Sequence, residues 1–453
     1  MKLPVKPPSF HAILKTLESS TTQLWRKQRQ VDVQELTAKA QSEYWNWEDC
    51  KYRAPTVGLT QEEFWAFIKI TRNSDRSRFA LLDSKKTSFS YSLPDEAGRL
   101  LHEADKSLAG HVGTDMADVS NPDYRAKYIF TSLREEAFAS SLIEGAVSTR
   151  SEAKEMIRTG RTPKNTSEWM ILNNFNTIQY LLLNRDKPLS LELLLDIQWR
   201  LTANTIDEAD AGRLRTDADQ ITIRDDSTGD VLHVPPPAHE LPDRLQKMCD
   251  FANADSSTSK PFIHPVIRSV LLHFWLAYDH PFVDGNGRTA RALFYWHMLR
   301  NGYWLAEFLS ISSIIARQPK KYYRAYLDTE SDDNDATYFI MYHLRVLEES
   351  VIALQRYVAK KKVEQAELAP LMNAQFNPRQ ESLLELAVKN PRAEFSYESH
   401  GKSHGVVIAT ARADILELVD LGLLNWNKKQ RPHRFTPHPD ILKRLQKKSK
   451  RKG

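Results

Sequence analysis

The sequence is poor in cysteine and has no long apolar run. Cys50 and Cys249 are the only cysteines in 453 residues, which excludes a disulfide framework or a cysteine-rich zinc site. No stretch approaches the roughly 18 consecutive apolar residues that a membrane-spanning helix requires. The first 20 residues lack the apolar core of a secretory signal, and no HisGluxxHis metal-hydrolase motif occurs. We therefore expect a cytoplasmic protein without a membrane segment.

Aromatic residues are abundant, and basic residues concentrate at one end of the chain. The 18 Phe, 16 Tyr and 10 Trp provide enough apolar surface for a folded core. Eleven Lys and Arg lie between Lys428 and the end of the chain, against the single Asp440. The preceding residues carry 52 basic and 57 acidic side chains. The positive charge is thus a C-terminal property, typical of either a nucleic-acid contact or a solubilising tail.

Periodicity and composition divide the chain into five segments and predict a mainly α fold. We expect a helical N-terminal region over 1–110, with helices around 11–44 and 60–72, and a helical core over 111–350. A charged helical linker over 351–375 and a small domain over 376–445 follow, and then a disordered basic tail over 446–453.

Two amphipathic helices flank a glycine-containing loop in the core segment. Apolar residues recur at three- and four-residue intervals over 265–278 and again over 287–301. Between them, Gly285 and Gly287 allow a phosphate to approach the backbone, and the following helix N-terminus adds partial positive charge. The loop therefore predicts an anion site.

Ionisable side chains next to this loop have the chemistry of phosphoryl transfer. Arg288 and Arg291 lie three residues apart and can clamp further phosphate oxygens. Asp284 is an oxygen donor of the kind that Mg²⁺ bridging two phosphates requires. His280 is an imidazole that can take a proton from a hydroxyl near neutral pH.

The stretch 280–291 resembles the signature of the Fic (filamentation induced by cAMP) family, HxFx(D/E)GNGRxxR, at every specified position. The resemblance implies a Fic-type helical core with a β-hairpin flap, and a protein adenylyltransferase that moves AMP from ATP to a hydroxyl of a target protein. It implies His280 as the general base and Asp284 as the Mg²⁺ ligand, with Phe282 as a buried anchor. The implied nucleotide-binding residues are Gly285, Asn286, Gly287, Arg288 and Arg291.

A second motif lies upstream, at the end of a helix expected at about 125–145. Ser140 and Glu144 are four residues apart, and Gly145 is suited to end the helix. The run resembles the inhibitory motif of the same family, (S/T)xxxE(G/N). The resemblance implies that Glu144 pairs with Arg291, occupies the place of the ATP γ-phosphate and restrains the enzyme.

Residues 220–234 interrupt the helical pattern and predict a β-hairpin. Two short apolar runs, 221–223 and 231–234, flank a polar turn that contains Gly229. The hairpin is either a surface decoration or, as the resemblance implies, a flap whose edge pairs with a target protein and presents its Ser, Thr or Tyr hydroxyl.

The C-terminal domain has the pattern of a winged helix. Helices are expected at 378–389, 396–404 and 406–421, followed by a basic hairpin. Such a domain can contact DNA or can be a protein-binding module. The candidate DNA contacts are Arg412, Lys428, Lys429 and Arg431.

Other functions remain open at this point. The chain could be a DNA-binding regulator whose Fic core senses nucleotide, although a sensor needs no base such as His280. The same fold could also use UTP, GTP or a phosphocholine donor, or remove AMP. The sequence decides neither the target protein nor whether the chain forms a homodimer.

Overall fold

The computed structural model describes residues 3–19, 26–74, 76–109, 122–225, 227–255, 258, 260–372, 376–428 and 431–450. Within these ranges the chain is mainly α-helical, and its strands form three two-stranded antiparallel sheets, which confirms the predicted fold class. Among the described helices, none combines the length and the apolar character needed to cross a membrane.

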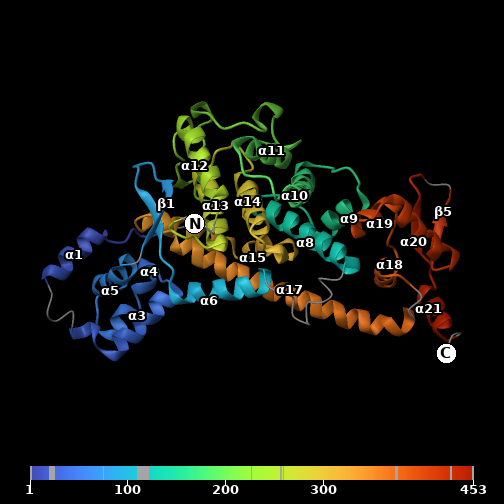
Figure 1. Cartoon of the computed structure of the whole chain (residues 1–453), viewed down its shortest axis with the longest axis horizontal. Coiled ribbons are helices and arrows are strands. Elements are labelled where there is room, and N and C mark those ends of the chain that lie inside the picture. The colour runs from blue at the N-terminus through green and yellow to red at the C-terminus, as the bar shows by residue number, and fades with distance from the viewer. Residues whose placement is uncertain are drawn as a thin grey trace. The chain divides into compact units, whose positions relative to one another are not determined.

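The regular elements are labelled in Figure 1. The helices are α1 (Phe10–Ser19), α3 (Val31–Glu43), α4 (Trp47–Cys50), α5 (Gln61–Asn73), α6 (Asp95–Ala104), α8 (Pro122–Ile143), α9 (Arg150–Thr159), α10 (Thr166–Leu183), α11 (Leu191–Thr202), α12 (Leu241–Asn253), α13 (Pro265–Asp279), α14 (Asn286–Arg300), α15 (Ile311–Ile315), α16 (Pro319–Ser331), α17 (Thr337–Met372), α18 (Pro378–Lys389), α19 (Tyr397–His404), α20 (Ile408–Asp420) and α21 (Ile441–Lys450). The paired strands are β1 (Ser77–Leu82) with β2 (Ser88–Tyr91), β3 (Ile223–Arg224) with β4 (Val231–His233), and β5 (Leu424–Asn427) with β6 (Arg434–Pro437).

The chain forms two compact units, which are described separately. The first unit comprises Met1–Ala109, Asn176–Ala306 and Ile311–Glu349. The second unit comprises Gly110–Phe175, Glu307–Ser310 and Ser350–Gly453. The N-terminal region thus belongs to the same compact unit as the residues of the predicted anion loop.

The N-terminal region contains a β-hairpin that the expectation of a purely helical region missed. Strand β1 alternates between buried and exposed side chains, with Phe79 and Leu81 facing inward. The Asp83 carboxylate accepts hydrogen bonds from the backbone N–H groups of Lys85 and Thr87, which shapes the turn to β2. The period-two pattern is short, so helical periodicity in the neighbouring segments masks it.

Buried ion pairs join the N-terminal region to the turn between α16 and α17. Lys69 on α5 is fully buried and donates to Asp332 at 2.7 Å. Tyr44 donates to Asp335 at 2.8 Å, and Arg76 also pairs with Asp335. Because a buried charge is costly without its partner, these contacts fix the N-terminal helices in the first unit.

Helices α13 and α14 lie side by side in the first unit (Figure 1). The sequence predicts one buried face for each helix, but α13 is buried on almost every side, including polar residues such as His273. A helix enclosed by neighbours on all sides forms the centre of a helical core. The loop between the two helices is therefore held on a rigid pair of elements.

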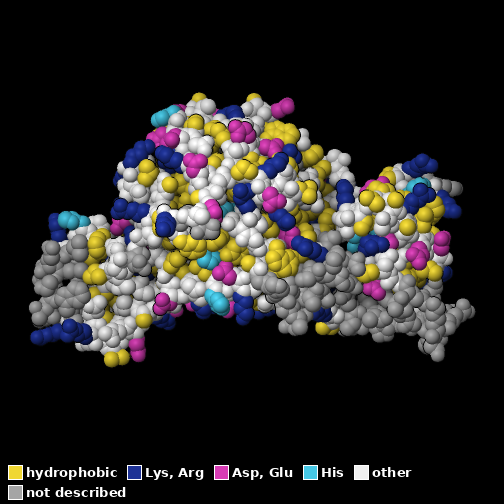
Figure 2. Space-filling view, in the orientation of Figure 1, with side chains coloured by type: hydrophobic (Ala, Val, Ile, Leu, Met, Phe, Trp, Pro, Cys, Tyr) yellow, Lys and Arg dark blue, Asp and Glu magenta, His cyan; other side chains and the backbone are white. Residues whose placement is uncertain are grey.

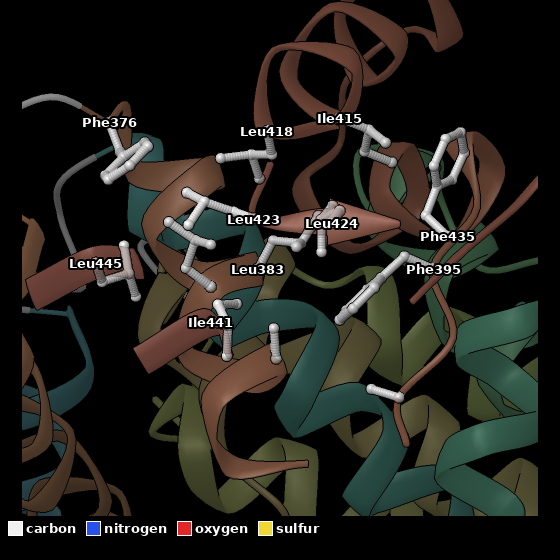
Figure 3. Close-up of a cluster of buried hydrophobic side chains, with 13 residues drawn as sticks. Phe376, Leu383, Phe395, Ile415, Leu418, Leu423, Leu424, Phe435, Ile441 and Leu445 are labelled. Carbon is white, nitrogen blue, oxygen red and sulfur yellow. The ribbon is translucent and has the colours of Figure 1, made fainter. Parts of the chain in front are cut away.

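The second unit contains the C-terminal domain, whose helices begin and end close to the predicted positions. Helices α18, α19 and α20 are followed by the β5–β6 hairpin, in which Leu424 pairs with Pro437 and Asn427 pairs with Arg434. Apolar side chains from α18, α20, both strands and α21 form one core (Figure 3), and Tyr397 of α19 packs against it.

Two segment predictions differ from the structure. The expected linker does not start a new element at 351, because α17 runs without a break from Thr337 to Met372. The expected disordered tail is helical as far as Lys450, since α21 continues through it, and residues 451–453 lie outside the described residues.

On the face shown in Figure 2, basic and acidic side chains are interspersed over the surface.

Candidate active site

The loop between α13 and α14 begins and ends with residues in the left-handed backbone region. His280 has φ of 45° and closes α13, with its N–H bonded to the Leu276 carbonyl at 2.9 Å. Pro281 follows and cannot extend the helix. Gly285 has φ of 86° and directly precedes the first residue of α14. The loop is thus a tight connection that leads into the N-terminus of a helix, whose first N–H groups have no acceptor within the helix.

The Asn286 side chain closes this loop internally. Its Oδ1 accepts from the Phe282 N–H at 3.0 Å, and its Nδ2 donates to the Phe282 carbonyl at 2.9 Å. Both residues are buried, and Phe282 is fully enclosed, as expected of an apolar anchor. The Asn286 side chain therefore holds the loop together through both of its polar atoms.

Glycine at position 285 is required for two reasons. Its φ is unfavourable for any residue with a side chain. A Cβ atom there would also lie 2.9 Å from Cγ2 of Thr202, at the end of α11. Gln198 on α11 supports the same loop, because its Nε2 donates to the Asp284 carbonyl at 3.0 Å. Helix α11 therefore forms a wall of the predicted anion site.

Arg288 and Asp284 form an ion pair beside the loop. Arg288 is fully buried and donates from Nη1 to the Leu201 carbonyl at 2.8 Å and from Nη2 to Asp284 Oδ2 at 3.1 Å. The Asp284 side chain is 45% exposed, so its carboxylate can still reach a ligand. Arg291 follows one turn later on α14 and is also buried.

The His280 ring is oriented by its own helix. Its Nδ1 lies 3.3 Å from the Ala277 carbonyl oxygen. Because a carbonyl oxygen only accepts, the neutral ring carries its proton on Nδ1 and keeps the lone pair of Nε2 available. Burial, assisted by the positive charge of His233, lowers the pKa of His280 to about 4. The imidazole is therefore a neutral acceptor throughout the physiological pH range.

Arg215 is a site residue that sequence reasoning missed. Its Nε donates to the His280 carbonyl at 2.7 Å, and its Nη2 donates to the Pro236 carbonyl at 2.6 Å. Its backbone N–H donates to Pro281 at 2.9 Å. A lone arginine in an irregular segment has no periodic signal, and only the fold reveals that it joins the His280 turn to the segment after the hairpin.

The hairpin predicted over 220–234 is present, and its strands are β3 and β4. His233 on β4 joins it to the core: Nδ1 lies 2.8 Å from Oε2 of Glu330, and Nε2 lies 2.8 Å from the Tyr278 carbonyl. Both partners are acceptors, so only the protonated imidazole satisfies both. Burial opposes that charge, but the Glu330 carboxylate and these hydrogen bonds raise the pKa of His233.

The motif at 140–145 lies at the end of α8, in the second unit. Ser140 is buried, Glu144 is half-buried, and Gly145 has φ of 87°, as a helix-ending glycine requires. Helix α8 itself ends at Ile143, two residues earlier than expected. The pairing of Glu144 with Arg291 stays a prediction.

The candidate DNA-binding residues lie at the C-terminal domain surface. Arg412 on α20 is exposed, and so are Lys428 and Arg431 near the β5–β6 turn. Lys428 lies over the Trp426 ring at 5.1 Å. Lys429 lies outside the described residues.

No group of three or more His, Cys, Asp or Glu side chains with metal-ligand geometry occurs among the described residues. A single half-exposed carboxylate is nevertheless compatible with Mg²⁺, which commonly binds through one or two carboxylates together with water and substrate phosphates. Mg²⁺ binding by Asp284 stays a prediction.

The geometry defines a helical domain whose central loop is suited to hold phosphate groups beside a neutral histidine. Residues 188–298, from α11 to α14, match the sequence model of the Fic/DOC family. The chain therefore contains a Fic domain.

Two curated relatives are similar to part of the chain. A protein adenylyltransferase Fic from Drosophila willistoni is 42% identical over 71 residues, or 16% of this chain and 14% of the relative. One from Nematostella vectensis is 26% identical over 222 residues, or 48% of this chain and 47% of the relative. The chain thus spans about half or less of these relatives. A crystal structure of a Fic family protein from Desulfovibrio desulfuricans G20 is 19% identical, has a TM-score of 0.48, and covers 77% of this chain and 98% of its own.

Proposed function

We propose that this chain is a protein adenylyltransferase that transfers AMP from ATP to a Ser, Thr or Tyr hydroxyl of a target protein and of itself. The observation that carries the proposal is the neutral His280, with its Nε2 lone pair available, in the same loop as the helix N-terminus of α14. A base and an anion site in one rigid turn are what an attack by a hydroxyl on a phosphate ester needs.

The proposed step uses the residues of the loop as follows. The hydroxyl oxygen forms a bond to the α-phosphorus of ATP while the bond from that phosphorus to the bridging oxygen breaks. Pyrophosphate leaves with the electron pair, and His280 Nε2 takes the hydroxyl proton. Backbone N–H groups at Gly287 and its neighbours stabilise the developing negative charge, and the buried Arg288 adds a fixed positive charge. Mg²⁺ held by Asp284 would neutralise phosphate charge.

The flap supplies the target in this proposal. Strand β4 is short and partly exposed, so an extended segment of a target can add to its edge through backbone hydrogen bonds. His233 attaches that strand to Glu330 and to the backbone carbonyl of Tyr278, and Tyr278 precedes His280 by two residues. Such docking selects an extended backbone and not a particular side-chain sequence.

Incubation of the purified chain with ATP labelled at the α-phosphate and Mg²⁺ tests the proposal. We expect covalent label on the wild-type protein and none on His280→Ala. The matched control is His239→Ala, whose side chain is 72% exposed and which should label like the wild type. ATP binding without any label would favour the nucleotide-sensor alternative, and preferential labelling by UTP or GTP would favour another donor.

We also propose that Glu144 restrains this activity by pairing with Arg291. The support is that Glu144 directly follows α8 and is half-buried, while the preceding Ser140 is enclosed. A carboxylate on Arg291 would occupy the position of an anionic phosphate. We expect Glu144→Gly to raise self-labelling at least tenfold, with the exposed Glu398→Gly as control. Equal labelling of the two variants would refute the restraint.

DNA binding by the C-terminal domain is a second proposal. It is supported by three helices and a hairpin that carry exposed Arg412, Lys428 and Arg431. We expect the chain to retard duplex DNA with an affinity that falls steeply with salt, and Arg412→Ala to weaken it. The cytoplasmic location, AMP removal and a homodimer stay predictions.

A further inference from the structure

A second cavity, separate from the loop of the Fic domain, lies within the second unit. Its volume is about 220 Å³, and its walls come from α8, α9, α17, α18 and α19. The side chains that line it are unusually basic: Arg134, Arg158, Lys361 and Lys389 face the single acid Glu385 among the described lining residues. Glu385 already accepts from both Lys361 and Lys389 at 3.0 Å.

Among the residues that the structure describes, Arg134 on α8 has no carboxylate ion-pair partner. Its Nε is buried and has no acceptor within the part of the chain that the structure describes. The one hydrogen bond seen for its guanidinium is a long contact of 3.4 Å from Nη2 to the Thr131 hydroxyl. Its face lies 4.6 Å from the centre of the Phe130 ring, an interaction that leaves the edge of the guanidinium available.

The nearby Glu135 and Glu155 form ion pairs with other cations and act on Arg134 only by longer-range attraction. Glu135 accepts from Arg150 at 2.6 Å, and Glu155 accepts from Arg158 at 2.6 Å. Burial lowers the pKa of Arg134 to about 10. Tyr357, Glu135 and Glu155 oppose this shift, and the positive charge of Arg158 adds to it. The guanidinium thus stays charged at neutral pH. Its side chain is half-buried and its Nε is fully buried, so a charge without an ion-pair partner is costly here.

We infer that this cavity binds a small oxyanion of the phosphate class through Arg134. The guanidinium offers a planar fork that matches two phosphate oxygens, and the neighbouring cations supply the remaining charge. The cavity is smaller than the roughly 300 Å³ at which pockets for drug-sized ligands begin, so it suits inorganic phosphate or a compact phosphomonoester and not an enclosed nucleotide. A bound anion would connect α8 to α18 and α19.

Titration calorimetry with inorganic phosphate, at constant ionic strength maintained with chloride, tests the inference. The loop between α13 and α14 is itself proposed to bind phosphate groups, so the phosphate isotherms of the wild type and the variants are compared with one another. We expect Arg134→Gln to lose one binding event and Arg134→Lys to weaken it about tenfold, because a lysine keeps the charge but not the fork. Arg125→Gln is the control, since Arg125 lies on the same helix, pairs with Glu307 and does not line the cavity.

Thermal melting gives a second, independent readout. In phosphate-free buffer, Arg134→Gln should melt at or above the wild-type temperature, because it removes a half-buried cation that has no ion-pair partner among the described residues. Phosphate should then raise the melting temperature of the wild type and of Arg125→Gln more than that of Arg134→Gln. Glycerol 3-phosphate in place of phosphate decides between a free anion and a phosphomonoester.

Two results would overturn the inference. One is identical phosphate isotherms for the wild type and Arg134→Gln. The other is a lower melting temperature of Arg134→Gln in phosphate-free buffer with no change in phosphate response, which would make Arg134 a packing residue. Binding requires no catalysis, so this test is independent of the proposed transferase activity.

Discussion

Replacing His233 with glutamine should release the flap from the core of the first unit. In the wild type the protonated ring spans Glu330 and the Tyr278 carbonyl, each at 2.8 Å. Glutamine can donate to one of these acceptors but carries no charge. A charge-assisted hydrogen bond is worth about 1.5–3 kcal/mol, and since Glu330 is 27% exposed we take the lower end, about 1.5 kcal/mol. The detached population of the flap should then rise about tenfold.

The pH dependence of the same anchor has a defined sign. The pKa of folded His233 is raised above its ordinary value near 6.5. The contribution of His233 to the stability of the attached flap is therefore complete below pH 6.5 and is lost as the pH rises through the pKa of His233 in the folded protein. Other groups near the ring are the buried Asp279, which Arg244 neutralises at 2.5 Å, and His280, which is neutral in this range.

Amide hydrogen exchange of residues 221–235, corrected for the intrinsic effect of pH, measures this anchor. We expect protection to fall about tenfold in His233→Gln at pH 6.0, and the difference from wild type to disappear at high pH. His239→Gln, with an exposed histidine in the same segment of the chain, is the control. Equal protection in His233→Gln and wild type at pH 6.0 would refute the reasoning.

Three further predictions follow from the site and from the C-terminal domain. Gly285→Ala should reduce self-labelling at least tenfold, because the new Cβ would lie 2.9 Å from Thr202. Gly302 also has a positive φ, of 85°, but has open space for a Cβ, so Gly302→Ala should change self-labelling little. Similar losses in the two variants would contradict the proposed clash with Thr202. Self-labelling should stay constant from pH 8 to 5 and fall at lower pH with a midpoint near 4, the pKa of His280. A midpoint near 6.5 would show that burial does not lower the pKa of His280. Asp414→Asn should destabilise the second unit by about 2–4 kcal/mol in denaturant unfolding, because Arg379 and His400 lose the carboxylate that accepts their hydrogen bonds. The pKa of Asp414 is lowered in the folded state, so the stability advantage of the wild type should vanish as the pH falls through that pKa. Replacing the exposed Asp440 with Asn should leave the stability unchanged.

Much of the site could be predicted because its residues are consecutive. The stretch 280–291 carries the proposed base His280, the glycines and both arginines, and the helices on either side have clear periodicity. The C-terminal helices were also predictable: α18 and α19 begin close to the expected positions 378 and 396, where Asn377 and Ser396 cap their N-termini. Local signals of this kind depend on neighbours within about one helical turn.

The sequence by itself therefore determined the helix–loop–helix element, the hairpin after α11 and the chemical class of the loop. Only the tertiary structure decided which distant residues hold that loop, such as Arg215 and Gln198, and that Asn286 closes the loop internally. It also decided that His280 is neutral, because a pKa depends on desolvation and on charges brought near by folding. Contacts between residues 45 to 97 positions apart, such as that of His233 with Glu330, leave no periodic trace in a single sequence.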